Sequence, residues 1–234
     1  MKTIGMLGGM SWESTALYYR LVNELVRDRL GGLHSARCLI HSVDFAEIEA
    51  MQVQGRWDDA GALLADAARS LEAAGADLVL LCTNTMHKVA DPVQAALTVP
   101  FLHLADATAD AALAAGVTTL GFLGTDFSMS DTFYTDRLTR RGLTVLIPDE
   151  QDRKQVHDII YKELCLGVFR EESRQTYRDV ITGLIDRGAE GIILGCTEIE
   201  LLVSQEDSPV PVFPTTHLHC QAAVAHALAE DPAT

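Results

Sequence analysis

Short, continuously apolar runs alternate along the chain with longer segments whose apolar positions recur at helical spacing. Runs such as Leu78–Leu81 and Ile192–Leu194 are apolar at every position, which is typical of parallel strands covered by helices on both faces. Alternating strands and helices predict parallel α/β sheets. The expected strands are 3–7, 36–43, 77–82, 99–103, 119–123, 143–147, 190–195 and 210–213. The expected helices are 12–29, 57–74, 105–115, 129–141, 152–166, 171–187 and 216–229.

The second half of the chain repeats the pattern of the first half. Gly75-Ala76-Asp77 and Gly188-Ala189-Glu190 both precede an apolar run, at an offset of 113 residues (188 − 75). Segments in the same order at a nearly constant offset predict two pseudo-symmetric parallel-sheet α/β domains that arose by internal duplication. Two further pairs of segments match in the same way: 4–10 with 120–126, and 99–103 with 210–214.

Polar motifs follow the expected strands at the end where each strand stops. In parallel α/β sheets, ligands bind beyond the carboxyl ends of the strands. No low-complexity linker separates the halves, so we expect them to pack closely, with the active site in the cleft between the domains. The motifs at strand ends are Gly8-Gly9-Met10-Ser11, Cys82-Thr83-Asn84-Thr85, Gly124-Thr125-Asp126 and Gly195-Cys196-Thr197-Glu198.

Composition narrows the class of partner. A formal charge of −15 on 234 residues argues against nucleic acid and against an anionic membrane as partners. The N-terminal apolar run is short and ends in glycines, unlike a secretory signal, and no apolar run approaches the roughly 20 residues that span a bilayer. The five cysteines include no CxxC pair, so free thiols in a reducing cytoplasm are the expected state.

The duplicated motifs differ at one position that matters for chemistry. Cys196 follows a strand and precedes an expected helix start, where the helix dipole should lower the thiol pKa below about 8.5 and favour a thiolate base. At the 113-residue offset its counterpart is Thr83. Cys82 comes one residue earlier, and because strand side chains alternate between faces, it should point away from Thr83. We therefore expect Cys196 and Thr83 to be the opposed groups.

Other polar residues are weaker candidates. The Gly8-Gly9 turn lacks GxGxxG spacing, so a dinucleotide is not expected, although the glycines allow close backbone approach to a small anion. His217 and His219 have no third ligand in the sequence, and a place at a helix start is favoured over a metal site. For His87 and Lys88, substrate contact and an ordinary helix surface remain equal alternatives.

The chain resembles the aspartate/glutamate racemase family, through Gly-Gly-Met-Ser-Trp-Glu-Ser-Thr at 8–15, Cys-Thr-Asn-Thr-Met-His-Lys at 82–88 and Gly-Cys-Thr-Glu at 195–198. Within the family it is most similar to bacterial broad-specificity or L-aspartate/glutamate-specific amino-acid racemases. The resemblance implies two α/β domains, no cofactor, an active site in the cleft, and two cysteines as opposed acid and base. The first of these positions is Thr83 here, so the chain departs from the two-thiol pattern, whereas the second is Cys196.

The resemblance also implies a small acidic amino-acid substrate and suggests a homodimer. It divides the chain into a first domain of residues 1–103 plus 214–234 and a second of residues 104–213, with the last helix packing back on the first domain. Substrate-contacting positions map onto Met10, Gln52, Thr83, Asn84, Thr85 and Thr197.

The resulting hypothesis is a cofactor-independent racemase acting on aspartate or glutamate, without a metal. Cys196 would remove the Cα proton, while Thr83, whose hydroxyl is too weak an acid to serve as a base near pH 7, would donate a proton or hold a water. A single-cysteine lyase or decarboxylase acting on a small dicarboxylate is the alternative. A non-catalytic binder of small carboxylates is the third interpretation. The sequence ranks neither the two amino acids nor the two directions of turnover.

Overall fold

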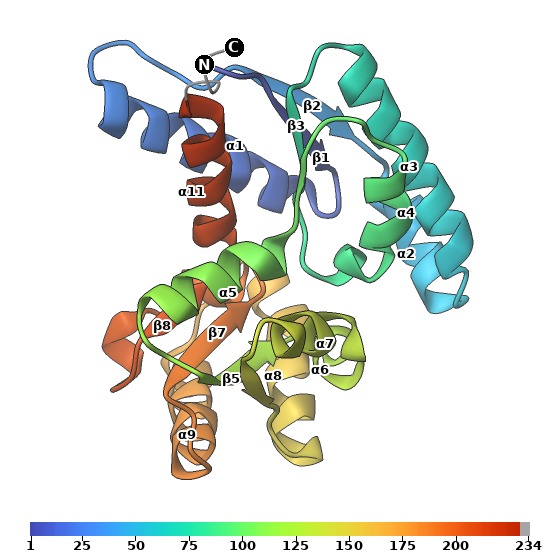
Figure 1. The fold of residues 1–234 in the computed structure, drawn as a ribbon. Helices are drawn as coiled ribbons and strands as arrows, with labels where there is room; N and C mark the ends of the chain where they lie inside the picture. The colour runs from blue at the N-terminus through green and yellow to red at the C-terminus, as the bar shows by residue number, and fades with distance from the viewer. Residues whose placement is uncertain (230–234) are drawn as a thin grey trace. The chain divides into compact units, whose positions relative to one another are not determined.

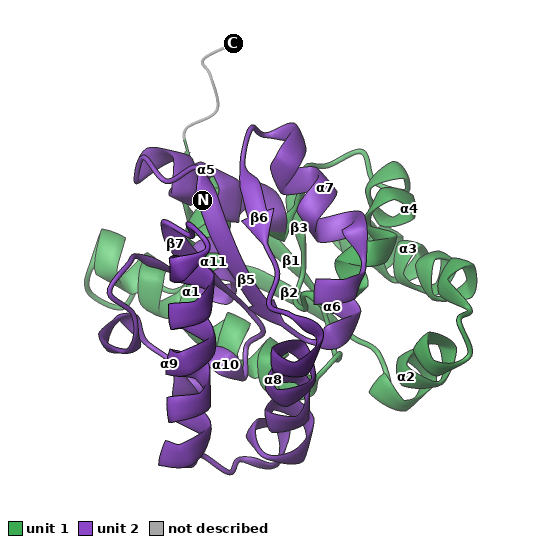
Figure 2. Ribbon diagram, turned by 90° about the horizontal axis from the view of Figure 1, so that it is seen from below, with its two compact units in different colours: residues 1–104, 219–234 green, residues 105–218 purple. Residues whose placement is uncertain are grey.

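The computed structural model describes residues 1–229, which fall into two compact units (Figure 2). Unit 1 comprises Met1–Leu104 and the chain from His219 onward, and unit 2 comprises Ala105–Leu218. The chain passes from unit 1 to unit 2 after residue 104, one residue later than the expected boundary at 103. It returns to unit 1 after residue 218, five residues later than the expected boundary at 213. The last residues of the expected first domain, 230–234, lie outside the described part of the chain.

Each unit contains one four-stranded parallel sheet (Figure 1). The strand order is β2-β1-β3-β4 in unit 1 and β6-β5-β7-β8 in unit 2, so the same topology occurs twice. The predicted α/β class and duplication are confirmed. The strands are β1 (Ile4–Gly8), β2 (Cys38–Ser42), β3 (Leu78–Leu81), β4 (Phe101–Leu102), β5 (Thr119–Gly124), β6 (Thr144–Leu146), β7 (Gly191–Gly195) and β8 (Val212–Pro214).

The repeat extends to individual hydrogen bonds at the strand starts. In unit 1 the carboxylate of Asp77, just before β3, accepts the backbone N–H of Thr3 at 2.6 Å. In unit 2 the carboxylate of Glu190, just before β7, accepts the backbone N–H groups of Thr118 at 2.8 Å and Thr119 at 3.0 Å. Each acid ties the start of one central strand to its neighbour, which explains why the motif Gly-Ala-acid is repeated.

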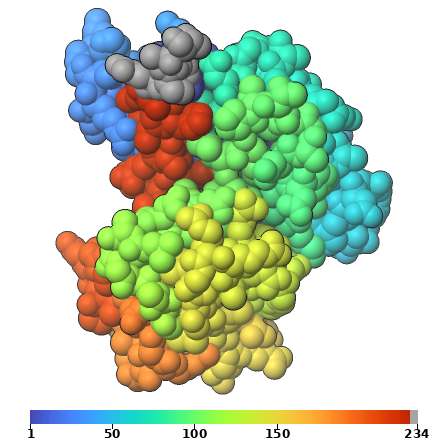
Figure 3. All heavy atoms as spheres, viewed as in Figure 1, coloured from blue at the N-terminus to red at the C-terminus, as the bar shows by residue number. Residues whose placement is uncertain are grey.

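Helices cover both faces of the sheet in unit 1. One buried cluster joins the sheet to α2 (Phe45–Val53), α3 (Trp57–Ala73) and the short helices η1 (Thr85–Val89) and α4 (Ala90–Ala95). The other joins it to α1 (Trp12–Leu30) and to α11 (Thr215–Leu228), which lies beside α1 (Figures 1 and 3). The expectation that the last helix packs on the first domain is thereby confirmed.

The helices of unit 2 differ in detail from the sequence pattern. The expected helix 129–141 is two helices, α6 (Asp126–Ser130) and α7 (Thr132–Arg140), because Asp131 adopts an extended conformation and its carboxylate caps α7 through the N–H of Thr132 and Phe133. The remaining elements are α5 (Leu104–Ala114), which begins at the last residue of unit 1, α8 (Glu150–Lys162), η2 (Leu164–Leu166), α9 (Glu171–Asp186), α10 (Ile199–Leu202) and η3 (Gln205–Asp207).

Two departures from the expected elements have clear local causes. Helix α2 was not predicted, because it buries only Ile48 and so has almost no apolar stripe to recognise. The expected helix 152–166 stops at Lys162 and continues as η2, which ends at Gly167 in a left-handed conformation. Across residues 1–229 no helix combines the length and apolar character needed to cross a membrane.

Glycines end the two long helices that precede β3 and β7. Gly75 follows α3 with φ of 99°, and Gly188 follows α9 with φ of 101°. The N–H of Gly75 donates to the backbone carbonyl of Glu72 at 2.9 Å, and the N–H of Gly188 donates to the backbone carbonyl of Ile185 at 2.8 Å. The predicted left-handed caps are confirmed, and only glycine adopts this conformation without strain.

His219 lies fully buried on α11, between α1 and β4. Its Nε2 donates to the carbonyl of Leu102 at 2.7 Å, because a carbonyl can only accept. Its Nδ1 therefore accepts from the Tyr18 hydroxyl at 3.0 Å. Burial lowers the pKa of His219 from 6.5 to about 4. The imidazole is neutral in the folded protein and joins α11 to both neighbours.

We predict that Gly188→Ala destabilises the protein by about 1 kcal/mol, because alanine is strained at positive φ. The matched control is Gly183→Ala, in the exposed interior of α9, where an added Cβ meets no atom within 4 Å. That change should stabilise the protein by about 0.5–1 kcal/mol. Urea unfolding measures both, and equal effects would contradict the conformational explanation.

We predict that His219 makes stability depend on pH between its unfolded and folded pKa values, 6.5 and about 4. The unfolded chain binds a proton in this window and the folded chain does not. The contribution of His219 to the free energy of unfolding is therefore complete above pH 6.5, and it falls by up to about 3 kcal/mol as the pH drops to 4. His219→Gln should show a smaller loss of unfolding free energy across this window than the wild type. The exposed His34→Gln serves as control, and parallel curves for all three proteins would disprove the assignment.

Candidate functional site

The turn between β1 and α1 is held by a compact set of hydrogen bonds. Gly9 has φ of 96°, and a Cβ there would lie 2.2 Å from the carbonyl oxygen of Val43. The Gly9 N–H donates to Thr15 Oγ1 at 2.8 Å, and that hydroxyl donates to the carbonyl of Ser11 at 2.9 Å. Ser11 caps α1 by accepting the N–H of Ser14. The glycines thus serve close backbone packing within the turn.

Cys82 and Thr83 take different environments at the end of β3. Alternate residues of β3 belong to opposite core clusters, with Leu81 in one and Cys82 in the other. The Cys82 side chain is fully buried, and burial raises its pKa strongly. Thr83 is half-buried. Thr83 lies in the turn after β3, where its N–H donates to the carbonyl of Leu81 at 2.9 Å, and the opposite orientation of the Cys82 and Thr83 side chains stays a prediction.

Met10, Gln52 and the turn 83–85 belong to the same edge of the unit 1 sheet. The Cys82 N–H donates to the carbonyl of Leu7 at 2.9 Å, which places the ends of β1 and β3 side by side. Met10 and Met86 belong to one buried cluster, and the Gln52 amide donates to the sulfur of Met86 at 2.9 Å. The fold of unit 1 therefore gathers these expected substrate-contacting positions around one turn.

Cys196 lies at the carboxyl end of β7, and its thiol donates to a carboxylate. The Sγ to Glu198 Oε2 distance is 2.9 Å, and the Thr197 hydroxyl donates to the same oxygen at 2.7 Å. Cys196 and Thr197 are buried, whereas Glu198 is half-buried. The arrangement supplies a thiol with a proton acceptor already in place.

The expected lowering of the Cys196 pKa is wrong. Burial raises the pKa of the Cys196 thiol well above its ordinary value, and the negative charge of Glu198 raises it further. The helix that follows, α10, begins only at Ile199 and has four residues, too few for a strong N-terminal dipole. The resting group is a thiol, and the sequence signal that could have shown this is the acidic residue two positions later.

Glu200 is a half-buried acidic residue that the sequence interpretation missed. Burial raises its pKa to about 7. Its Oε1 accepts the N–H of Thr216 at 2.8 Å, in the first turn of α11, and the neighbouring Thr215 hydroxyl donates to the carbonyl of Leu194 at 2.9 Å. The start of α11 is thus joined both to the segment after Cys196 and to β7.

The end of β5 is supported by side chains from α8. The backbone N–H of Asp126 donates to His157 Nδ1 at 3.2 Å, and the Asp126 carboxylate pairs with Arg153 at 3.5 Å. Gly124 is paired in register with Gly195, so this turn adjoins the Cys196 turn. The sequence indicated Gly124-Thr125-Asp126, but Arg153 and His157 carried no motif.

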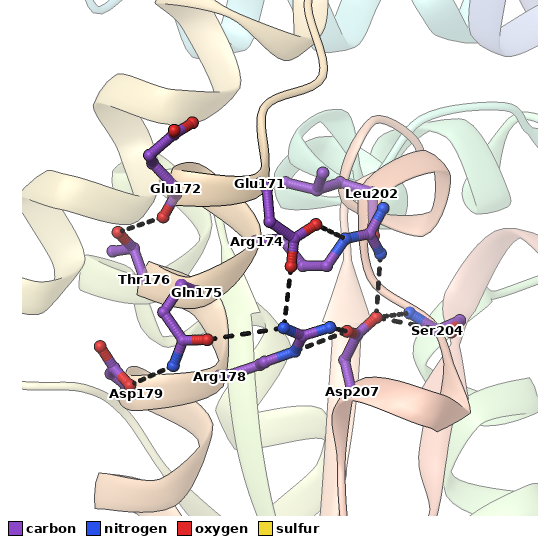
Figure 4. Close-up of polar contacts among 10 residues, drawn as sticks. All are labelled: Glu171, Glu172, Arg174, Gln175, Thr176, Arg178, Asp179, Leu202, Ser204 and Asp207. Carbon is purple, nitrogen blue, oxygen red and sulfur yellow. Dashed lines mark hydrogen bonds and ion pairs between the residues drawn. The ribbon is translucent and has the colours of Figure 1, made fainter.

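A charged cluster fixes the chain beyond α10 (Figure 4). The buried carboxylate of Asp207 accepts from Arg178 at 2.9 Å, from Arg174 at 3.1 Å and from the Ser204 backbone N–H at 2.9 Å. Burial alone would raise the pKa of Asp207, but the Ser204 N–H and the two arginines lower it overall. Arg174 also donates to the carbonyl of Leu202, the last residue of α10. The cluster therefore anchors the segment that leaves the Cys196 turn.

His87 and Lys88, neighbours in η1, have different surroundings. The Lys88 ammonium lies 4.2 Å from the centre of the Trp57 ring, a cation–π contact. His87 is buried, with 3% of its surface exposed, and lies next to the rings of Phe101, His103 and His219. Within the described chain, no group of three or more His, Cys, Asp or Glu side chains is placed to hold a metal ion.

Comparison with known proteins decides the family. Residues 7–223 match the family described as Asp/Glu/hydantoin racemase. The chain belongs to this family. It is 53% identical to a candidate Asp/Glu racemase of Yersinia pestis, covering 98% of this chain and all of that one, with a TM-score of 0.94. It is 34% identical to an aspartate racemase homologue of Pyrococcus horikoshii, covering 97% and 99% of the two chains, with a TM-score of 0.88.

A more distant structure shares the fold alone. The Picrophilus torridus aspartate racemase is 19% identical, with a TM-score of 0.75 and coverage of 97% of this chain and 94% of that one. Membership of the Asp/Glu/hydantoin racemase family supports an isomerase of the racemase type.

We predict that Glu198→Gln lowers the pKa of Cys196, because it removes the negative charge beside a buried thiol. The rate of Cys196 alkylation by iodoacetamide at a fixed pH should rise, as measured by mass spectrometry of the Cys196 peptide. The exposed Glu206→Gln on η3 is the control and should leave the rate unchanged. An unchanged rate in Glu198→Gln would show that burial alone sets the pKa.

Proposed function

We propose that the protein is a cofactor-independent racemase of aspartate or glutamate. The observation that supports this most directly is the Cys196 thiol donating to the Glu198 carboxylate at 2.9 Å, at the carboxyl end of a central parallel strand. Membership of the racemase family supports the reaction class. Aspartate or glutamate as the substrate is part of this proposal.

Cys196 acts as the base through Glu198. The thiol passes its proton to the Glu198 carboxylate, and the resulting thiolate removes the proton from the substrate Cα. The hydrogen bond of 2.9 Å gives the thiol proton a direct path to the Glu198 carboxylate. The return step reverses this order, with Cys196 donating to Cα and regaining its proton from Glu198.

Thr83 acts on the opposite face of the substrate. Its hydroxyl, or a water held by it, donates the proton that completes the inversion, and exchange with solvent then returns a proton to this group and removes one from Glu198. Backbone N–H groups at the strand-to-helix turns stabilise the charge that develops on the substrate carboxylate.

A thiol and a hydroxyl make the two half-reactions unequal. The enantiomers have the same free energy, so kcat/KM must be equal in the two directions. The inequality therefore appears in kcat at saturating substrate and in the rate at which solvent deuterium enters Cα from each enantiomer. The direction in which Cys196 is the base should exchange faster.

We predict that Thr83→Cys changes the ratio of the two saturating rates by about tenfold or more, because a thiol can serve as acid and as base. Cys196→Ser should lower exchange from both enantiomers by about 10²- to 10⁴-fold. Initial rates and Cα deuterium incorporation are measured with L- and D-aspartate and L- and D-glutamate.

The controls use the other cysteines. Cys82→Ala removes a fully buried thiol and Cys38→Ser a half-buried one in β2, and neither should change the rate ratio. A Thr83→Cys protein with the wild-type ratio would remove Thr83 from the mechanism. Release of CO₂ in place of deuterium exchange would favour decarboxylation, and binding without exchange at Cα would leave only a carboxylate-binding protein.

A further inference from the structure

His87 connects two backbone groups that lie far apart in sequence. Its Nδ1 is 2.7 Å from the carbonyl oxygen of Thr83, and its Nε2 is 3.2 Å from the backbone nitrogen of Leu104. Thr83 lies two residues after the end of β3, and Leu104 is the first residue of α5. One imidazole therefore joins the turn that carries the opposing group to the beginning of a helix.

The chemistry of the two partners fixes the state of the ring. A carbonyl oxygen can only accept a hydrogen bond, so Nδ1 must carry the proton. A backbone N–H can only donate, so Nε2 must be unprotonated. His87 is thus neutral, in a single tautomer. A protonated ring would present a donor to the Leu104 N–H.

The surroundings hold this ring in place. The His103 ring lies 4.5 Å away and the His219 ring 5.8 Å away, centre to centre. His219 is itself fixed between Tyr18 and Leu102. The rings that face His87 of η1 thus come from β4, the β4–α5 segment and α11.

We propose that His87 is a positioning residue for the Thr83 turn. By holding the Thr83 carbonyl, it sets the backbone at this residue and hence the direction of the Thr83 hydroxyl. It also sets the direction of the N–H groups of Asn84 and Thr85. The inference rests on the proposed racemase function for its catalytic consequence, but the two hydrogen bonds stand independently of that function.

Two substitutions separate the two hydrogen bonds. In His87→Asn the side-chain amide N–H takes the place of Nδ1 and can donate to Thr83, whereas the acceptor for Leu104 is lost. In His87→Gln the longer side chain reaches the Nε2 position and can accept from Leu104, whereas the donor to Thr83 is lost. Both changes remove the same ring from the core, so each variant is the control for the other.

The test combines kinetics with amide hydrogen exchange on the full-length protein. His87→Gln should lower kcat for Cα exchange of L- and D-aspartate or glutamate by about tenfold, whereas His87→Asn should stay within about twofold of wild type. The Leu104 amide should exchange faster in His87→Asn and keep its protection in His87→Gln. This crossed pattern is not expected from a role in packing alone.

Each outcome decides a separate question. Equal loss of kcat in both variants, or a wild-type kcat in His87→Gln, would overturn the positioning role. Equal Leu104 protection in both variants would overturn the bridging geometry on which it rests. A wild-type protein that exchanges no Cα proton from any of the four amino acids would remove the proposed function, while the Leu104 measurement would still judge the bridge.

Discussion

The direction of the parallel strands is the constraint on which the other features of this protein depend. Because all four strands of a sheet run the same way, their carboxyl ends meet at one edge, and the turns that follow expose backbone N–H groups there. In unit 1 this edge gathers Met10, Gln52 and the turn 83–85, and in unit 2 it gathers Cys196, Thr197 and the end of β5. The direction of the strands thus determines which edge of each sheet carries the candidate residues.

Each unit uses buried polar side chains to hold these turns. In unit 1, His87 and His219 join strand ends to helices through backbone carbonyl and N–H groups. In unit 2, Asp207 holds the chain at η3, and Glu200 holds the start of α11. Buried polar groups are tolerated because their hydrogen bonds are satisfied. These contacts convert loops, which are ordinarily mobile, into fixed supports for Thr83 and Cys196.

The electrostatics around Cys196 differ from those of a thiol activated in its resting state. Burial and the neighbouring carboxylate both favour the protonated form. A protonated thiol is a weak nucleophile, and this one donates its hydrogen bond to the Glu198 carboxylate at 2.9 Å. Cys82, despite its place in a strand-end motif, is enclosed in the core of unit 1.

Sequence alone determined the repeated strands and the glycine caps at Gly75 and Gly188, because these follow from short-range periodicity and backbone conformation. It also determined which motifs lie at strand ends. Only the tertiary structure decided that Cys196 is buried, that Glu200 meets the start of α11, and that His87 bridges Thr83 and Leu104. Burial, and hydrogen bonds between residues distant in the chain, depend on how whole elements pack, and no local pattern encodes them.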